Sequence, residues 1–166
     1  FAKNIDWPNQ GELSRFKIAL YRTEEREFVD TLRSLEGDGK LQGKPISVTK
    51  VYKAESLSKY QLVYVESPNS ELIAQIYKGI DGKPILLVTR DYDNKQEVMI
   101  NLHAVVDGLM KFEVNKSNIL NQGLTPMPEL ILNGGTEIDV AKLFREGQAS
   151  LIALQKQLAN REATLV

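Results

Sequence analysis

Apolar residues along the chain follow two periods, one typical of buried strands and one typical of helices. Three short runs are almost continuously apolar, as in strands covered on both faces of a sheet: residues 16–21, 62–65 and 84–88. A fourth run, residues 46–51, alternates imperfectly and predicts an edge strand. Amphipathic helical patterns at residues 24–35 and 71–78 lie between these strands. Such alternation predicts an α/β fold with a mostly parallel sheet and flanking helices on both faces.

The pattern changes after residue 97, where two alternating segments predict an antiparallel hairpin added to the sheet. Residues 98–106 and 109–115 are separated by Asp107-Gly108, a pair that favours a tight hairpin turn. The polar positions of the hairpin share one face, which we expect to be solvated or partly covered: Asn101, His103, Lys111, Glu113 and Asn115.

The last stretch, residues 136–166, carries a heptad pattern. One core position holds Phe144, Leu151, Leu158 and Leu165, and the other holds Val140, Gly147, Leu154 and Arg161. This spacing predicts a long helix with a narrow apolar seam, about 40 Å long from Asp139 onward. A helix of that length is longer than most of the preceding domain, so we expect it to leave the domain and to pair through its seam. The alternative is a terminal helix packed back on its own domain.

The same stretch suggests how the chain divides. Asn133-Gly134-Gly135 is interpreted as a hinge-like break, after which Thr136 is well placed to cap the long helix. We therefore expect an α/β domain at residues 1–135 and a signalling helix at residues 136–166. Because the first residue is Phe, we expect the chain to be a processed protein or an excised domain.

The composition of the chain argues against several classes of function. The 166 residues have a net charge of −1, with Lys and Arg dispersed, which argues against a nucleic-acid surface. No apolar run reaches the length of a membrane span. The absence of cysteine excludes disulfides and thiol catalysis, and a catalytic triad or metal site would depend on one histidine, His103. We therefore expect no enzymatic activity, no cofactor and no metal.

Candidate ligand-binding residues follow from the architecture, because ligands of open parallel sheets bind beyond the carboxyl ends of the strands. Those ends offer guanidinium groups, hydroxyls and helix N-termini that suit a small polar or anionic ligand. The same residues also suit ordinary caps and turns, and the single tryptophan suits a core anchor. The candidates are Trp7, Arg22, Thr23, Ser67, Asn69, Arg90 and Asp91.

Several segments resemble, in order and spacing, the YfiR family of bacterial extracytoplasmic domains. They are the opening FAKNIDWP, the strands LVYVES and PILLVTRD, the hairpin MINL…KFEVN and the closing residues 118–132. The resemblance covers about residues 1–133 and implies an α/β sandwich with a regulatory, non-enzymatic role. The residues shared with the family are Trp7, Asp91, Asn101, Phe112, Glu113 and Asn115.

The family has two forms, and two features of this chain distinguish between them. One form is a small periplasmic protein that represses a membrane-bound diguanylate cyclase, and many such members pair cysteines that this chain lacks. The other is a sensor domain N-terminal to histidine kinases and related transducers. The missing cysteines and the heptad helix beyond the family's usual end favour the sensor form.

The resulting hypothesis is a periplasmic sensor domain of an inner-membrane signalling protein, either a two-component histidine kinase or a cyclase. We expect it to bind a small molecule or a periplasmic protein and to transmit the signal as a homodimer through a coiled coil of its C-terminal helix. Contact with a membrane is expected only through parts of the full-length protein outside this fragment. The alternative is a stand-alone periplasmic repressor of a diguanylate cyclase.

Overall fold

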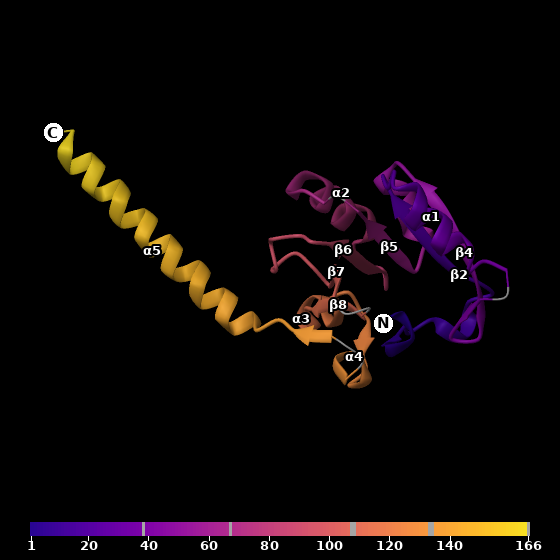
Figure 1. The fold of residues 1–166 in the computed structure, drawn as a ribbon. Helices are drawn as coiled ribbons and strands as arrows, with labels where there is room; N and C mark the ends of the chain where they lie inside the picture. The colour runs from indigo at the N-terminus through magenta and orange to yellow at the C-terminus, as the bar shows by residue number, and fades with distance from the viewer. Residues whose placement is uncertain (38, 67, 107–108, 133–134, 166) are drawn as a thin grey trace.

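The computed structural model describes residues 1–37, 39–66, 68–106, 109–132 and 135–165. Side chains are described for these residues except 28, 104–106, 109–110 and 140. The described chain forms an α/β domain from which one long helix, α5 (Val140–Thr164), extends (Figure 1).

A curled sheet of eight described strands forms the body of the domain, in the order β10-β8-β7-β6-β5-β2-β4-β3. The strands are β2 (Phe16–Tyr21), β3 (Lys40–Leu41), β4 (Lys44–Val51), β5 (Leu62–Val65), β6 (Leu86–Arg90), β7 (Ile100–Val106), β8 (Leu109–Val114) and β10 (Gly135–Glu137). From β4 to β7 the neighbouring strands run parallel, and β8 returns antiparallel to β7. The predicted fold class, a mostly parallel sheet with an added hairpin, is confirmed. Only the two-residue β3 lies outside β4 at its edge of the sheet.

Helices α1 (Arg26–Arg33) and α2 (Ser70–Ile80) lie on opposite faces of this sheet. Side chains along a strand point alternately to the two faces of a sheet. Ile18 and Tyr21 of β2 are an odd number of residues apart and therefore face opposite sides, Ile18 toward α1 and Tyr21 toward α2. The Tyr21 hydroxyl donates a hydrogen bond to Gln75 Oε1 of α2 at 3.1 Å. The inner face of α2 is buried through three isoleucines, whereas the only fully buried side chain described on α1 is Val29. The face under α1 is therefore the less tightly covered one.

Smaller elements close the domain around the sheet. A two-stranded sheet pairs β1 (Ile5–Asp6) with β9 (Thr125–Pro126), which ties the start of the chain to the segment after the hairpin. The remaining elements are short: the 3-10 turns η1 (Ala2–Asn4), η2 (Gln10–Glu12) and η3 (Ala54–Lys59), and the helices α3 (Lys116–Asn121) and α4 (Glu129–Leu132).

Close packing of α2 on η3 depends on Gly79. A Cβ at this position would lie 2.2 Å from the backbone oxygen of Ala54. We expect Gly79→Ala to lower the free energy of unfolding by about 1–3 kcal/mol, because the backbone must shift to relieve this overlap. The gain of about 1 kcal/mol that alanine brings to an unstrained helix would not offset that loss.

Gly147→Ala is the matched control for this prediction, since it makes the same change inside a helix. The nearest atom to a Cβ at Gly147 is Gln96 Nε2 at 3.8 Å, an ordinary contact distance. Circular dichroism should show unchanged or higher helicity for Gly147→Ala and a lower urea midpoint for Gly79→Ala. Equal urea midpoints for Gly79→Ala and the unmodified chain would contradict the packing argument.

The segment before α5 differs from the prediction of a hinge with a threonine cap. Residues 133 and 134 lie outside the described part of the chain, but Gly135 begins β10, which pairs in parallel with β8. A Cβ on Gly135 would lie 2.7 Å from the Leu130 backbone oxygen, so glycine serves close packing here. Thr136 lies in the middle of β10 and is not the helix cap. Asp139 caps α5 instead, accepting a hydrogen bond from the Lys142 backbone N–H at 2.9 Å.

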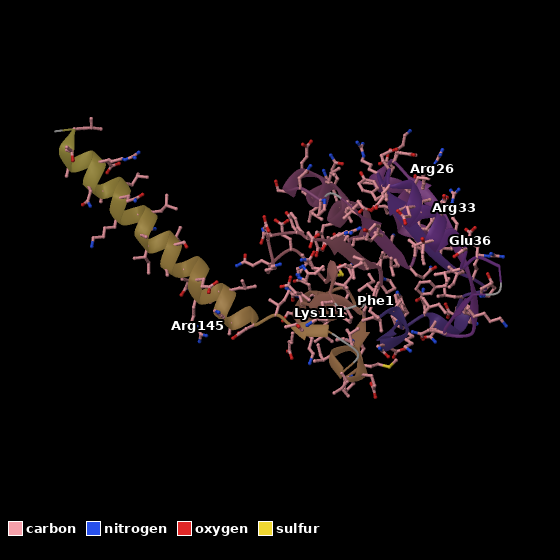
Figure 2. The ribbon with its side chains drawn as sticks, viewed as in Figure 1. Phe1, Arg26, Arg33, Glu36, Lys111 and Arg145 are labelled. Carbon is pink, nitrogen blue, oxygen red and sulfur yellow. The ribbon has the colours of Figure 1, made fainter. Side chains whose placement is uncertain are left out.

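The long helix α5 has the predicted form and leaves the domain, so the alternative of a helix packed back on its own domain is wrong. Its 25 residues run away from the sheet, and their side chains project freely around the helix (Figure 2). Leu143, near its start, is partly buried, whereas five large apolar side chains further along α5 and the C-cap are more than half exposed: Phe144, Leu151, Ile152, Leu154, Leu158 and Leu165. The side chain of Val140 lies outside the described set.

Candidate functional site

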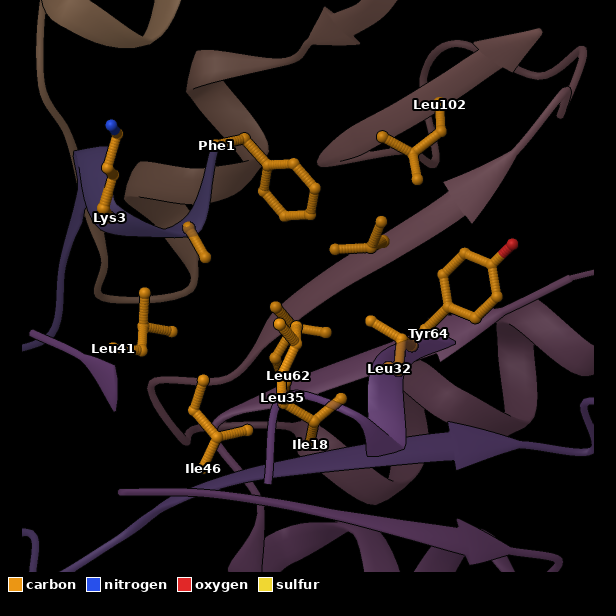
Figure 3. Close-up of a pocket in the computed structure, with 12 residues that line it drawn as sticks. Phe1, Lys3, Ile18, Leu32, Leu35, Leu41, Ile46, Leu62, Tyr64 and Leu102 are labelled. Atoms are coloured by element: carbon orange, nitrogen blue, oxygen red, sulfur yellow. The ribbon is translucent and has the colours of Figure 1, made fainter. Parts of the chain in front are cut away.

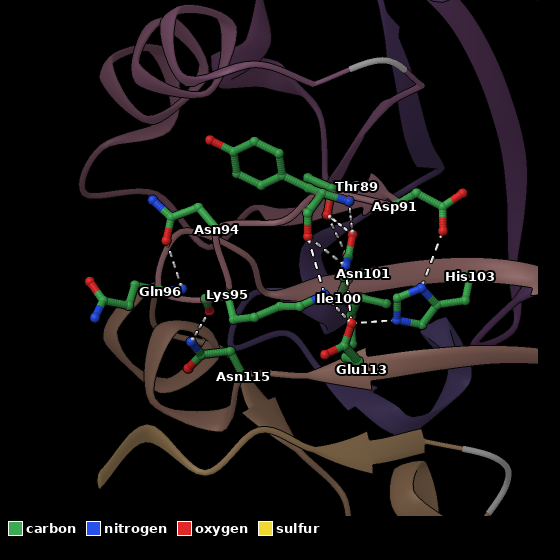
Figure 4. A network of polar contacts seen from close by, with 11 residues as sticks. Thr89, Asp91, Asn94, Lys95, Gln96, Ile100, Asn101, His103, Glu113 and Asn115 are labelled. Carbon is green, nitrogen blue, oxygen red and sulfur yellow. Dashed lines mark hydrogen bonds and ion pairs between the residues drawn. The ribbon is translucent and has the colours of Figure 1, made fainter. Parts of the chain in front are cut away.

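A network of polar side chains covers one face of the β7–β8 hairpin, and its centre is Asn101 (Figure 4). The Asn101 side chain is fully buried, and its Oδ1 accepts hydrogen bonds from Thr89 Oγ1 (2.7 Å) and the Tyr92 backbone N–H (3.1 Å). Its Nδ2 donates to the Tyr92 carbonyl oxygen (3.1 Å) and to Glu113 Oε1 (3.2 Å). One amide thus links β6, β7, β8 and the start of the loop at residues 91–99, which we call the covering loop.

Charged groups lie directly beside this amide. Glu113 Oε1 accepts a hydrogen bond from Lys95 Nζ of the covering loop at 2.5 Å and contacts His103 Nε2 on β7. The other ring nitrogen of His103, Nδ1, lies 3.2 Å from Asp91 Oδ1. His103 therefore bridges two carboxylates and joins the first residue of the covering loop to the hairpin.

The covering loop is also held at its far side. Asn115, buried directly after β8, donates from Nδ2 to the Lys95 carbonyl oxygen at 3.1 Å. Its Oδ1 caps α3 by accepting a hydrogen bond from the Asn118 backbone N–H at 3.1 Å. Asn118 Nδ2 donates to the carbonyl oxygens of Gln96 and Val98, at 2.8 and 2.7 Å. Sequence alternation placed Asn101, Glu113 and Asn115 on one strip of the hairpin, and the structure adds the loop that covers them.

The surroundings of Glu113 change its acidity. Burial acts to raise the pKa of its carboxyl, but hydrogen bonds from Lys95, His103 and Asn101 outweigh burial and bring the pKa below the usual 4.5. The carboxylate form is therefore favoured in the folded chain, where it has three donors.

This shift predicts a pH dependence of stability that Glu113→Gln should remove. Because the folded pKa lies below the unfolded one, Glu113 stabilises the domain fully above about pH 5, and this contribution is lost as pH falls through the folded pKa. We expect Glu113→Gln to lower the free energy of unfolding by about 1–3 kcal/mol at pH 7. The difference between the two proteins should shrink below about pH 4.5.

Urea unfolding at a series of pH values measures this difference. The matched control is Glu55→Gln, which makes the same change at an exposed residue of η3. A constant difference between Glu113→Gln and the unmodified chain from pH 3 to 7 would show that the charge of Glu113 contributes nothing.

A second cluster lies at the carboxyl ends of β5 and β6. Arg90 NH1 lies 2.9 Å from Glu66 Oε1 and 3.4 Å from Glu25 Oε2, at the start of α1. The Tyr64 hydroxyl donates to Glu66 Oε2 at 3.2 Å. Burial, together with the neighbouring Glu25, raises the pKa of Glu66, and Arg90 and Tyr64 offset part of that rise. The guanidinium of Arg90 thus already has two carboxylate partners.

The other candidates from the sequence lie apart from one another. Asn69 is exposed and caps α2 by accepting from the Leu72 N–H at 2.9 Å, and Thr23 is buried with its hydroxyl on the Tyr21 carbonyl oxygen. Arg22 lies with its guanidinium 5.8 Å from the centre of the Tyr21 ring. Ser67 lies outside the described residues. The structure brings Arg90 and Asp91 into clusters of charged side chains. In contrast, the contacts described for Arg22, Thr23 and Asn69 are with residues close to them in the sequence.

Trp7 lies far from these residues, beyond the amino end of β5. Its indole N–H donates to the Gln61 carbonyl oxygen at 3.2 Å, and its ring packs edge-on against Phe16. The side chain is buried, with 2% exposed. These contacts match the interpretation of Trp7 as a core anchor.

Two of the candidate residues adopt an unusual backbone conformation. Arg22 and Asp91 directly follow β2 and β6, with φ values of 51° and 48°. The left-handed region costs a non-glycine residue about 1–2 kcal/mol. Such strain persists only where the surroundings impose it, and it is common at functional sites. Asp91 is the stronger example, because its carboxylate also contacts His103.

An apolar cavity of about 400 Å³ lies on the α1 side of the sheet (Figure 3). Its wall is the sheet, its roof is α1 and the following turn, and one end is closed by the first residues of the chain. The lining residues are Phe1, Ala2, Lys3, Ile18, Leu32, Leu35, Leu41, Ile46, Leu62, Tyr64, Val88 and Leu102. The sequence predicted none of this space, since each of these positions is what a closed core also requires.

In the part of the chain that the structure describes, no three His, Cys, Asp or Glu residues are grouped so that they could hold a metal ion. Among the same residues, no helix is both long enough and apolar enough to cross a membrane.

The described residues thus form an α/β domain with a mostly parallel sheet, extended by a hairpin whose polar face is covered by a loop. The chain belongs to the YfiR/HmsC-like family, whose sequence profile matches residues 1–133. This confirms the predicted family and indicates a periplasmic regulatory domain. No curated protein sequence matches the chain significantly.

Proposed function

We propose that this chain is the sensing domain of a membrane-anchored signalling protein, a histidine kinase or a cyclase, and that it transmits through paired α5 helices. The family match ends at residue 133, and α5 lies beyond it. In this proposal the YfiR/HmsC-like domain receives the signal and α5 carries it toward an output domain. Neither step requires catalysis by this chain.

The observation that carries the proposal is the exposed apolar seam of α5. Phe144, Leu151 and Leu158 recur every seven residues, and each is at least 58% exposed. Leu154 lies on the same stripe, between Leu151 and Leu158, as the second core position of a heptad requires. A single helix leaves such a stripe in water, whereas a second copy of the same helix buries it in register. A parallel pair also brings the two output domains together.

Pairing of α5 is tested by sedimentation equilibrium of the 166-residue chain. We expect a reversible monomer–dimer equilibrium, with dimers at protein concentrations up to about 1 mM, the effective concentration that tethering to one membrane complex provides. A chain that remains monomeric throughout this range would remove the main support for signalling through the helix.

The second candidate function is a stand-alone periplasmic repressor of a membrane diguanylate cyclase, and the family match favours it as well. In that case α5 binds the partner instead of a second copy. The coding sequence downstream of Val166 distinguishes the two functions. A hydrophobic span followed by an output domain supports the sensor, and a nearby stop codon supports the repressor.

A further inference from the structure

The apolar cavity under α1 is too large to be a packing defect. Native interiors rarely hold voids larger than a water molecule, and an engineered cavity of roughly 150 Å³ already binds benzene. The cavity here measures about 400 Å³, which lies within the range of small-molecule sites. Its walls are formed by side chains of β2, β4, β5, β6 and β7, so the rigid sheet determines its shape.

Water is a poor occupant of this space. A buried water needs about two to four polar partners, and ten of the twelve lining residues offer only carbon atoms in their side chains. The exceptions are Tyr64, whose hydroxyl donates to Glu66, and Lys3, which is exposed. Figure 3 shows the ammonium group of Lys3 pointing away from the other lining side chains. An apolar molecule that displaces such poorly bonded water gains affinity.

The interior of the cavity excludes a charged group, and the cationic groups among its lining residues, the partly buried α-amino group of Phe1 and the exposed ammonium of Lys3, lie at the end that the first residues close. A charge placed among Ile18, Leu62 and Val88 would lose its hydration without gaining a partner, because each of these side chains is apolar and less than 10% exposed. A ligand can keep a polar group in water only at the mouth, where Leu35 is 43% exposed.

We propose that the cavity under α1 is a binding site for a neutral, mainly hydrocarbon small molecule. The apolar part of the ligand lies against Ile18, Leu62 and Val88, beneath Leu32 of α1. This inference deepens the proposed sensing function by naming the chemical class of the ligand, and it rests on that function only for its biological meaning.

Occupancy of the cavity also has a route to the rest of the domain. Tyr64 forms part of the wall, and its hydroxyl is bonded to Glu66, which pairs with Arg90. Arg90 in turn lies against Glu25, the residue that precedes α1. Tyr64, Glu66, Arg90 and Glu25 thus form a chain of polar contacts, and a ligand that touches both Tyr64 and α1 contacts its two ends. Arg90 is followed directly by Asp91, which contacts His103, so this chain leads to the polar network of the hairpin.

The probe pair that tests the proposal is 1-octanol and octanoate, which share a hydrocarbon chain and differ in charge. Methyl NMR spectra of the 166-residue chain report binding at Ile18, Ile46, Leu62 and Val88 directly. We expect about 1 mM 1-octanol to shift these methyl signals and octanoate to bind at least about tenfold more weakly. Unshifted methyl signals with octanol, or equal affinity for octanoate, would overturn the proposal.

Two variants locate the site by filling it. Val88→Phe adds volume to the wall, and Ala2→Phe adds volume at the end that the first residues of the chain close, away from the centre of the sheet. Each should weaken octanol binding at least about tenfold while leaving the circular dichroism spectrum unchanged. If Val88→Phe fails to fold, Ala2→Phe decides the question. Octanol binding unchanged in a folded filling variant would contradict this location.

Leu151→Glu is the control for binding to the other apolar surface, the seam of α5. We expect this variant to bind octanol as the unmodified chain does. Loss of binding in Leu151→Glu would place the ligand on the seam and overturn the assignment to the cavity. Because octanol binding and helix pairing are separate readouts, failure of one leaves the result of the other interpretable.

Discussion

Replacing Asn101 with alanine is expected to lower the free energy of unfolding by about 2–4 kcal/mol, the largest stability effect of any single polar change in the described part of the chain. The variant removes four hydrogen bonds at a fully buried position. It also leaves the Tyr92 backbone N–H without its partner, whereas the Tyr92 carbonyl oxygen keeps Lys95 Nζ at 3.3 Å. A buried unsatisfied group costs more than the bond itself contributed. The covering loop should therefore loosen as the domain weakens.

Urea unfolding and hydrogen exchange of the covering loop measure the two effects of Asn101→Ala. The matched control is Asn94→Ala, in the same loop, where the side chain is exposed and accepts from the Gln96 N–H at 3.2 Å. We expect the control to change stability by less than about 0.5 kcal/mol. A similarly small effect of Asn101→Ala would show that water replaces the lost hydrogen bonds and that the network is not essential to the domain.

The second large effect concerns the seam of α5. Leu151→Glu places two carboxylates at the core of a paired helix, one from each copy, and removes two buried leucine side chains. With about 1.5–3 kcal/mol per buried leucine, the dissociation constant of the dimer should rise at least about 100-fold. Sedimentation equilibrium compares this variant with the unmodified chain.

Ile152→Glu is a close control because it alters the neighbouring residue on the same helix. Leu151 and Ile152 are similarly exposed, at 58% and 65%, but successive residues point about 100° apart around a helix. Only Leu151 belongs to the heptad core, so Ile152→Glu should leave the dimer nearly intact. Equal weakening by both substitutions would indicate nonspecific association of apolar surfaces.

The sequence was sufficient to predict the strands of the sheet because burial on both faces leaves a plain signal. The runs at Phe16–Tyr21 and Leu62–Val65 match β2 and β5, and alternation located the hairpin. The helix α5 was predictable for the same reason, since its heptad spacing does not depend on the rest of the fold. These patterns are local, and the structure follows them.

The candidate site was only partly predictable, because its chemistry depends on long-range contacts. Alternation showed that Asn101 and Glu113 share a face, but only the folded covering loop brings Lys95 to Glu113 and buries Asn101. Similarly, the sequence predicts Gly135 to be part of a hinge because glycine often marks a break. In the fold its missing side chain gives β10 room beside Leu130.

The cavity left no signal in the sequence at all. Ile18, Leu62 and Val88 have the apolar character of any buried strand, and the space beside them depends on how far α1 stands from the sheet. Volume enclosed between elements is a property of tertiary packing, so no periodicity along the chain reports it.

The attachment of α5 to the sheet has a mechanical consequence. Between Glu137, the last residue of β10, and Val140, the first of α5, only Ile138 and Asp139 intervene, and the Ile138 N–H is still bonded to the Val114 carbonyl oxygen at 2.9 Å. The 25-residue helix is therefore a lever of about 37 Å joined to the hairpin without slack. A tilt of about 10° at its base would move its far end by about 6 Å, roughly one helical turn. A small rearrangement of the β7–β8 hairpin is thereby amplified at the far end of α5.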